Sequence, residues 1–95
     1  MPFGRVLRLG KKVSSGAISA RVLPSDEPRL GISVSRRYGN AVRRNTFKRR
    51  ARAAFRKYHP MLPSVAVVIS PVPENTKMSY DSIDKFFLKL CDYSA

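Results

Sequence analysis

Apolar side chains recur along the chain with the spacings of helices and strands. One set follows positions i, i+4, i+7, i+8 and i+11, which is a single stripe along an α-helix. The residues of this stripe are Phe47, Ala51, Ala54, Phe55 and Tyr58. Asn40 is the expected N-cap of the helix. The helix is expected to end at His59, because Pro60 disfavours helical backbone at the residue before it.

Three segments have the patterns of β-strands. Residues 30–35 alternate apolar and small polar side chains, which indicates a strand with one buried face. Residues 17–23 alternate more weakly. Residues 65–70 are largely β-branched, which is typical of a strand covered on both faces. The segments 30–35 and 65–70 flank the long helix, so they could be parallel strands joined by a helical crossover.

Two further helices complete the predicted fold. A short one begins at Phe3 and ends at Gly10, and the last one has Ile83, Phe86, Phe87 and Leu90 on its inner side. The elements predict one α+β domain over residues 1–95, and we expect the order αβββαβα, in which one strand before the long helix has no assigned range. We expect a small central sheet of about four strands with the helices packed on one face.

The long helix carries a strongly one-signed charge. Between Ser35 and Lys57, ten residues are Arg or Lys, and residues 28–73 contain no Asp or Glu. The whole chain has a net charge of +13. Such charge repels itself unless a polyanion binds to it. Arginine outnumbers lysine nine to two between Pro28 and Pro73, and the guanidinium fork suits bidentate phosphate contacts. Nucleic acid is therefore the favoured partner.

An anionic membrane surface is the alternative partner for a cationic helix. The apolar stripe of this helix is narrow, consists mostly of Ala and Phe, and is needed to cover the sheet. No apolar run reaches the roughly 18 residues that span a bilayer, and basic residues interrupt the start of the chain, unlike a secretion signal. We therefore expect a cytoplasmic protein that does not act at a membrane.

Groups for catalysis are sparse and scattered. A nuclease active site needs clustered carboxylates for metal ions or a histidine base beside a nucleophile. The carboxylates of this chain lie in two loops and the last helix, at Asp26, Glu27, Glu74, Asp81, Asp84 and Asp92. The only histidine, His59, lies at a predicted helix end, where it can help to cap carbonyl groups. We predict no catalytic residue and no metal site in this chain.

The segment from Val34 to Arg49 resembles a motif of a known family. It reads VSRRYGNAVRRNTFKR and is similar to the Val-Ser-Lys-Lys-x-Gly-x-Ala-Val-x-Arg-Asn-Arg-x-Lys-Arg stretch of the protein subunit of bacterial ribonuclease P. Ala54 and Phe55 match the continuation of that family's helix. Weaker similarity extends over most of the chain.

The resemblance implies an endoribonuclease subunit that helps to remove the 5′ leader from precursor tRNA. In that family the RNA subunit carries out catalysis with Mg²⁺ bound chiefly by the RNA. The resemblance also implies a left-handed crossover around the basic helix and a monomeric protein within the complex. The residues that it places against the catalytic RNA, with their basic neighbours, are Arg36, Arg37, Arg43, Arg44, Asn45, Lys48, Arg49 and Arg52.

The same resemblance implies a cleft for the leader between the sheet and the start of the basic helix. Its predicted contacts are Phe3, Ile18 and Arg21, with Phe3 as a platform for base stacking. Leu7, Ile18 and Arg21 fall where the family commonly has aromatic or larger groups. Thr46 stands where the motif has its second arginine, which removes a cation but keeps a hydroxyl donor. The chain also starts inside the family's first helix.

Without the family resemblance, the residues are also compatible with two other functions. A small structural RNA-binding protein, such as a ribosomal component, would follow the same charge logic without a leader cleft. A membrane-surface protein would use the cationic helix alone. The spacing Gly39-x-Ala41-Val42-x-Arg44-Asn45 favours the ribonuclease P subunit over both.

Overall fold

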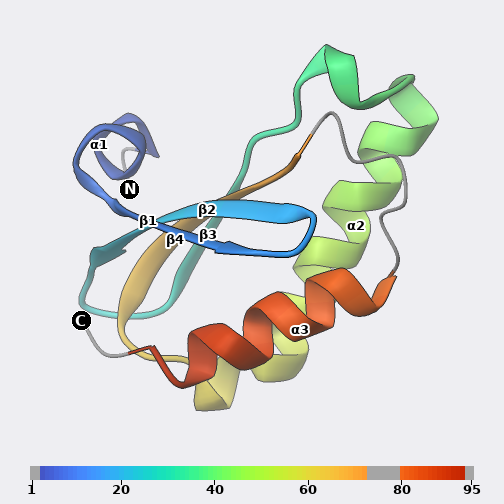
Figure 1. Ribbon diagram of the computed structural model, residues 1–95. Helices are drawn as coiled ribbons and strands as arrows, with labels where there is room; N and C mark the ends of the chain where they lie inside the picture. The colour runs from blue at the N-terminus through green and yellow to red at the C-terminus, as the bar shows by residue number, and fades with distance from the viewer. Residues whose placement is uncertain (1–2, 73–79, 94–95) are drawn as a thin grey trace.

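A four-stranded sheet and three α-helices form the computed structural model, which describes residues 3–72 and 80–93, with the backbone alone at Phe3 and Tyr80 (Figure 1). Along the chain the elements are α1 (Phe3–Leu9), β1 (Lys11–Ser15), β2 (Ile18–Pro24), β3 (Arg29–Ile32), the 3₁₀ helix η1 (Arg36–Tyr38), α2 (Ala41–Tyr58), the 3₁₀ helix η2 (His59–Met61), β4 (Val65–Pro71) and α3 (Tyr80–Cys91). The predicted α+β class and the order αβββαβα are confirmed.

The sheet is mixed, with the strand order β1-β2-β4-β3. β1 and β2 form an antiparallel hairpin that turns at Gly16, where φ is +58° and a residue without a side chain is favoured. β4 pairs antiparallel with β2 and parallel with β3. α2 therefore connects two parallel, neighbouring strands, as the sequence predicts. The left-handed sense of this crossover stays a prediction of the family resemblance.

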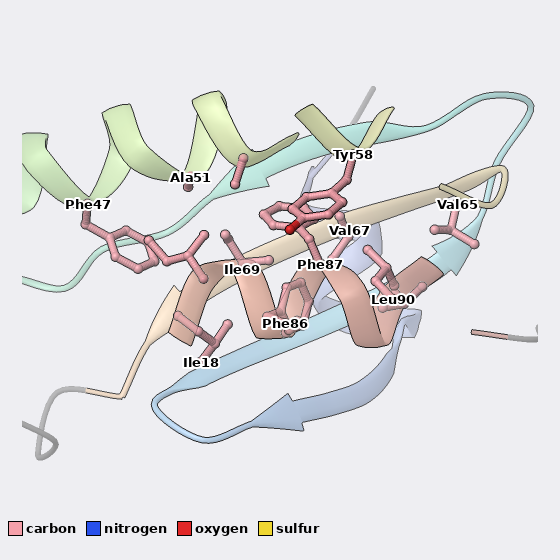
Figure 2. Close-up of a cluster of buried hydrophobic side chains, with 14 of the residues drawn as sticks. Ile18, Phe47, Ala51, Tyr58, Val65, Val67, Ile69, Phe86, Phe87 and Leu90 are labelled. Atoms are coloured by element: carbon pink, nitrogen blue, oxygen red, sulfur yellow. The ribbon is translucent and has the colours of Figure 1, made fainter. Parts of the chain in front are cut away.

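The larger core lies between one face of the sheet and helices α2 and α3 (Figure 2). α2 buries the predicted residues Phe47, Ala51, Ala54 and Tyr58, and Phe55 is half-buried beside them. α3 buries Ile83, Phe86, Phe87 and Leu90. The rings of Phe86 and Phe87 meet edge to face with centroids 5.4 Å apart. Each fully buried side chain of this size contributes roughly 1.5–3 kcal/mol, so this core fixes α2 firmly on the sheet.

The opposite face of the sheet is covered by α1, so the prediction that the helices share one face was wrong. Val6 of α1 packs on Ala66 and Val68 of β4, with Leu23 of β2 beside them. β4 is apolar on both faces, as its β-branched sequence predicts, and the second face therefore requires its own cover. α1 ends where the Gly10 amide donates to the Val6 carbonyl oxygen at 2.8 Å. A Cβ at Gly10 would collide with that oxygen.

β3 is shorter than the predicted strand 30–35, because it ends at Ile32. The Ser33 amide still donates to the Ile69 carbonyl oxygen at 2.9 Å. Ser35, however, uses its hydroxyl oxygen to accept from the Arg37 amide at 3.0 Å and caps η1. Serine side chains compete with strand pairing in this way. The chain thus leaves the sheet before the basic helix begins.

Candidate nucleic-acid interface

The start of α2 is held in place by a short network of hydrogen bonds. Asn40 is the N-cap, and its Oδ1 accepts from the Arg43 amide at 2.9 Å, as the sequence predicts. The Asn40 carbonyl oxygen accepts from the Arg44 amide at 3.0 Å. η1 and the first turn of α2 stand clear of the sheet at the upper right of Figure 1. The positive end of the α2 dipole therefore lies among the arginines of both helices, which makes this end of the molecule strongly electropositive.

The structure brings all eight predicted RNA-binding residues together on η1 and α2. Six of them are exposed, namely Arg36, Arg37, Arg43, Asn45, Arg49 and Arg52. Arg44 and Lys48 are half-buried, and Lys48 lies on the side of α2 that faces β3. No acidic residue occurs between residues 28 and 73. The exposed sides of η1 and α2 therefore carry cations and no acid from either helix, which suits a chain of phosphates.

Two arginines of the first turn are fixed by neighbouring groups. The Arg44 guanidinium donates through Nη1 to the Gly39 carbonyl oxygen at 2.7 Å. The Arg43 guanidinium carbon lies 4.5 Å from the centroid of the Tyr38 ring, in a cation–π contact. Thr46 keeps a hydroxyl donor at the position of the motif arginine, and this hydroxyl donates to the Val42 carbonyl oxygen at 2.8 Å. Its donor is thus used within the helix.

A groove runs between the edge strand β3 and α2. One hollow of about 230 Å³ is lined by Leu30, Gly31, Ile32, Lys48 and Arg52. The next hollow, of about 330 Å³, shares Leu30 and Arg52 and adds Phe55 and Arg56. The groove is therefore lined by apolar side chains, Leu30, Ile32 and Phe55, and by cations from α2. This combination fits a single strand of nucleic acid, whose bases are apolar on their faces and whose backbone is anionic.

Two residues of this surface, Arg56 and Val42, are not among the predicted RNA-binding residues. Arg56 lies one turn after Arg52 on the same side of α2, and the i, i+4 spacing was the available signal. Val42 is 74% exposed among the arginines of the first turn. Its position outside the apolar stripe of α2 was the corresponding signal. An exposed valine adds an apolar contact to a surface that is otherwise cationic.

Two of the predicted leader-binding residues, Ile18 and Arg21, lie on opposite faces of β2. Ile18 is 0% exposed and lies in the core under α2 and α3, so its predicted contact with the leader is wrong. The alternation of β2 places Ile18 on the core face and exposes Arg21 on the other. Arg21 donates through Nη1 to the Gly10 carbonyl oxygen at 3.4 Å. The side chain of Phe3 lies outside the described residues.

The carboxylates that the structure describes lie in separate places. Arg29 pairs with Asp26 at 3.3 Å and with Glu27 at 3.0 Å, in the loop before β3. Hydrogen bonds from Ser25 and Arg29 to Asp26, and the charge of Arg29, lower the pKa of that carboxyl. Asp81 and Asp84 lie in α3. Within residues 3–72 and 80–93, no three His, Cys, Asp or Glu side chains gather as metal ligands would.

No helix within residues 3–72 and 80–93 is both long enough and apolar enough to cross a bilayer. α2 has 18 residues, but eight of them are Arg or Lys.

Comparison with known proteins gives a consistent result. The sequence profile of the ribonuclease P family matches residues 1–94. A ribonuclease P protein component from Chlamydia trachomatis serovar L2 is 38% identical over 90 residues, covering 87% of this chain and 75% of the relative. The ribonuclease P protein of Thermotoga maritima, solved in complex with 1-(4-fluorophenyl)-2-thiourea, has a TM-score of 0.82 at 25% identity and covers 97% of this chain and 94% of its own. The Staphylococcus aureus protein has a TM-score of 0.81 at 27% identity, with coverage of 95% and 88%.

Proposed function

Because the chain belongs to the ribonuclease P protein family, as the protein subunit of this tRNA-processing endoribonuclease, we propose that η1 and α2 form the surface that binds the catalytic RNA. One observation carries the proposal. The eight cationic or polar residues expected from the motif all lie on η1 and α2, and neither helix contains an acid. Arginine forks on a rigid helix present donors at fixed spacing, which suits recognition of a folded RNA backbone.

Catalysis in the complex belongs to the RNA subunit. Mg²⁺, bound chiefly by that RNA, would activate the attacking water and stabilise the leaving oxygen. The chain's own part is electrostatic, because cations along α2 reduce the repulsion between two RNA backbones. The pairing of both Asp26 and Glu27 with Arg29, in the loop before β3 and thus in a different element from Asp81 and Asp84 on α3, supports this division of labour.

The 5′ leader of precursor tRNA would lie in the groove between β3 and α2. Lys48 and Arg52 face this groove and can neutralise leader phosphates, while Leu30, Ile32 and Phe55 offer apolar contacts to bases. Contacts of this kind tolerate most sequences, which suits a leader that differs between transcripts. Arg21, exposed on the opposite face of the sheet, is available to a longer leader. Stacking on Phe3 stays a prediction.

A single copy of the chain would act in the cytoplasm of a bacterium. The Chlamydia trachomatis relative is a bacterial ribonuclease P protein component. A net charge of +13 makes association of two free copies unfavourable, so the monomer would assemble directly with RNA.

The decisive experiment reconstitutes the complex. Purified protein is added to a bacterial ribonuclease P RNA, and cleavage of precursor tRNA is measured at low Mg²⁺. We expect the protein to raise the cleavage rate, because its cations replace part of the charge neutralisation that Mg²⁺ otherwise supplies.

Two outcomes would contradict the proposal. Tight RNA binding without any gain in cleavage would favour a purely structural RNA-binding protein. Metal-dependent cleavage by the highly purified protein alone, abolished by Asp81→Asn or Asp84→Asn, would place catalysis in this chain.

A further inference from the structure

Arg43, in the first turn of α2, is held in place by the turn that precedes the helix. Arg43 lies with its guanidinium carbon 4.5 Å from the centroid of the Tyr38 ring. The side chain of Tyr38 is 7% exposed, and its ring meets Phe47 of the core edge to face with centroids 5.8 Å apart. The ring is therefore a rigid platform that is anchored in the core, and Arg43, itself exposed, rests on it.

Gly39 leaves the space that this contact requires. A Cβ at Gly39 would lie 2.6 Å from Cδ of Arg43 and 3.2 Å from its Cβ. These atoms are in the root and middle of the side chain, so a larger residue at position 39 would push Arg43 from its place. Gly4, in contrast, has open space where a Cβ would be.

The position of Arg43 matters because the next residue on its side of α2 supplies no cation. Thr46, at i+3, turns its hydroxyl to the Val42 carbonyl oxygen at 2.8 Å. An arginine that is already held in one conformation loses less side-chain entropy when it binds. Its fork also keeps donors that can reach a phosphate, since the ring contact uses the face of the group and not its N–H bonds.

We propose that Tyr38 and Gly39 are positioning residues that hold the Arg43 guanidinium ready for a phosphate of the ribonuclease P RNA. The inference rests on the proposed function, because it assumes that this end of α2 binds that RNA. It adds that affinity depends on the turn before the helix as well as on the helix cations. Tyr38 and Gly39 act through Arg43 and need not touch the RNA.

A double-mutant cycle on binding to the ribonuclease P RNA alone tests this. Arg43→Gln should weaken binding on the order of tenfold and reduce the magnitude of the log–log salt slope by roughly 0.7–0.9. Tyr38→Leu should weaken binding about two- to fivefold, the range of an exposed cation–π contact. In the Arg43→Gln background, Tyr38→Leu should change binding by less than about twofold. Tyr38→Phe keeps the ring and should bind like the wild type.

Gly39→Ala provides a test that leaves the aromatic core unchanged, and Gly4→Ala is its matched control. We expect weaker RNA binding for Gly39→Ala only, and no such effect in the Arg43→Gln background. Melting temperatures show whether each variant is folded at the temperature of the assay. The affinity of the assembled complex for precursor tRNA is measured in parallel, and a loss confined to that affinity would assign the Arg43 contact to the substrate and overturn the inference.

The inference would also be overturned if Tyr38→Leu or Gly39→Ala bound the RNA as tightly as the wild type. The same holds if either substitution reduced the RNA affinity equally in the wild-type and the Arg43→Gln backgrounds. Failure of the wild-type protein to bind the RNA at all would instead contradict the proposed function.

Discussion

Long cationic side chains at the start of α2 make specific contacts within the protein. Arg44 is bonded to the Gly39 carbonyl oxygen, and Arg43 rests on Tyr38. A free arginine side chain loses up to about 2 kcal/mol of conformational entropy when it is fixed, and here part of that cost is met on folding. Each guanidinium has five N–H donors, so one internal contact leaves most of them for RNA.

The rate at which the Cys91 thiol is alkylated should depend on pH differently in the folded and the unfolded protein. Burial raises the pKa of this group, and the neighbouring Asp92 charge acts in the same direction. Since the thiolate is the reactive form, alkylation by iodoacetamide at pH 8 should be slower in the folded protein than in urea. The difference should shrink as the pH rises further. Equal rates for the folded and the unfolded protein at pH 8 would show that the pKa is not raised.

At the scale of elements, α2 depends on the residue that precedes it. Asn40 accepts a hydrogen bond from a backbone amide in the first turn, and the N-terminal end of α2 stands clear of the sheet (Figure 1). Asn40→Ala should therefore lower the free energy of unfolding by about 0.5–2 kcal/mol, measured by urea denaturation.

Asn45→Ala is the matched control for this substitution. Asn45 is exposed inside the same helix, where alanine is the better helix former. We expect this variant to be at least as stable as the wild type. An equal loss of stability in both variants would mean that the Asn40 cap has no special role.

At the scale of the whole molecule, a cation on α2 is expected to contribute more to RNA binding than a cation on α3. Matched substitutions on the two helices test this difference. Arg49 on α2 and Lys85 on α3 are both exposed, and replacing either by Ala removes one positive charge. Arg49→Ala should weaken binding to the ribonuclease P RNA and reduce the magnitude of the log–log salt slope by roughly 0.7–0.9. Lys85→Ala should change both much less. Equal effects would indicate diffuse attraction by the net charge of +13 and no defined binding face.

Local patterns identified most elements but not their boundaries or their arrangement. The stripe from Phe47 to Tyr58, the Asn40 cap and the β-branched strand β4 were all predictable, because each rests on neighbouring residues. β1 was included in the predicted order, but no range was assigned to it. Its residues Lys11–Ser15 show only one partly buried apolar side chain, Val13, so pairing with β2 decides that this segment is a strand.

The sequence by itself determined the helix, its cationic surface and the family motif, since periodicity, charge and spacing are properties of contiguous residues. Only the tertiary structure decided which side of each strand faces the core, and it placed Ile18 inside and Arg21 outside. It also placed α1 on the second face of the sheet and Arg43 on Tyr38. These features depend on contacts between segments that are brought together by folding, and a pattern along one segment does not specify its partner.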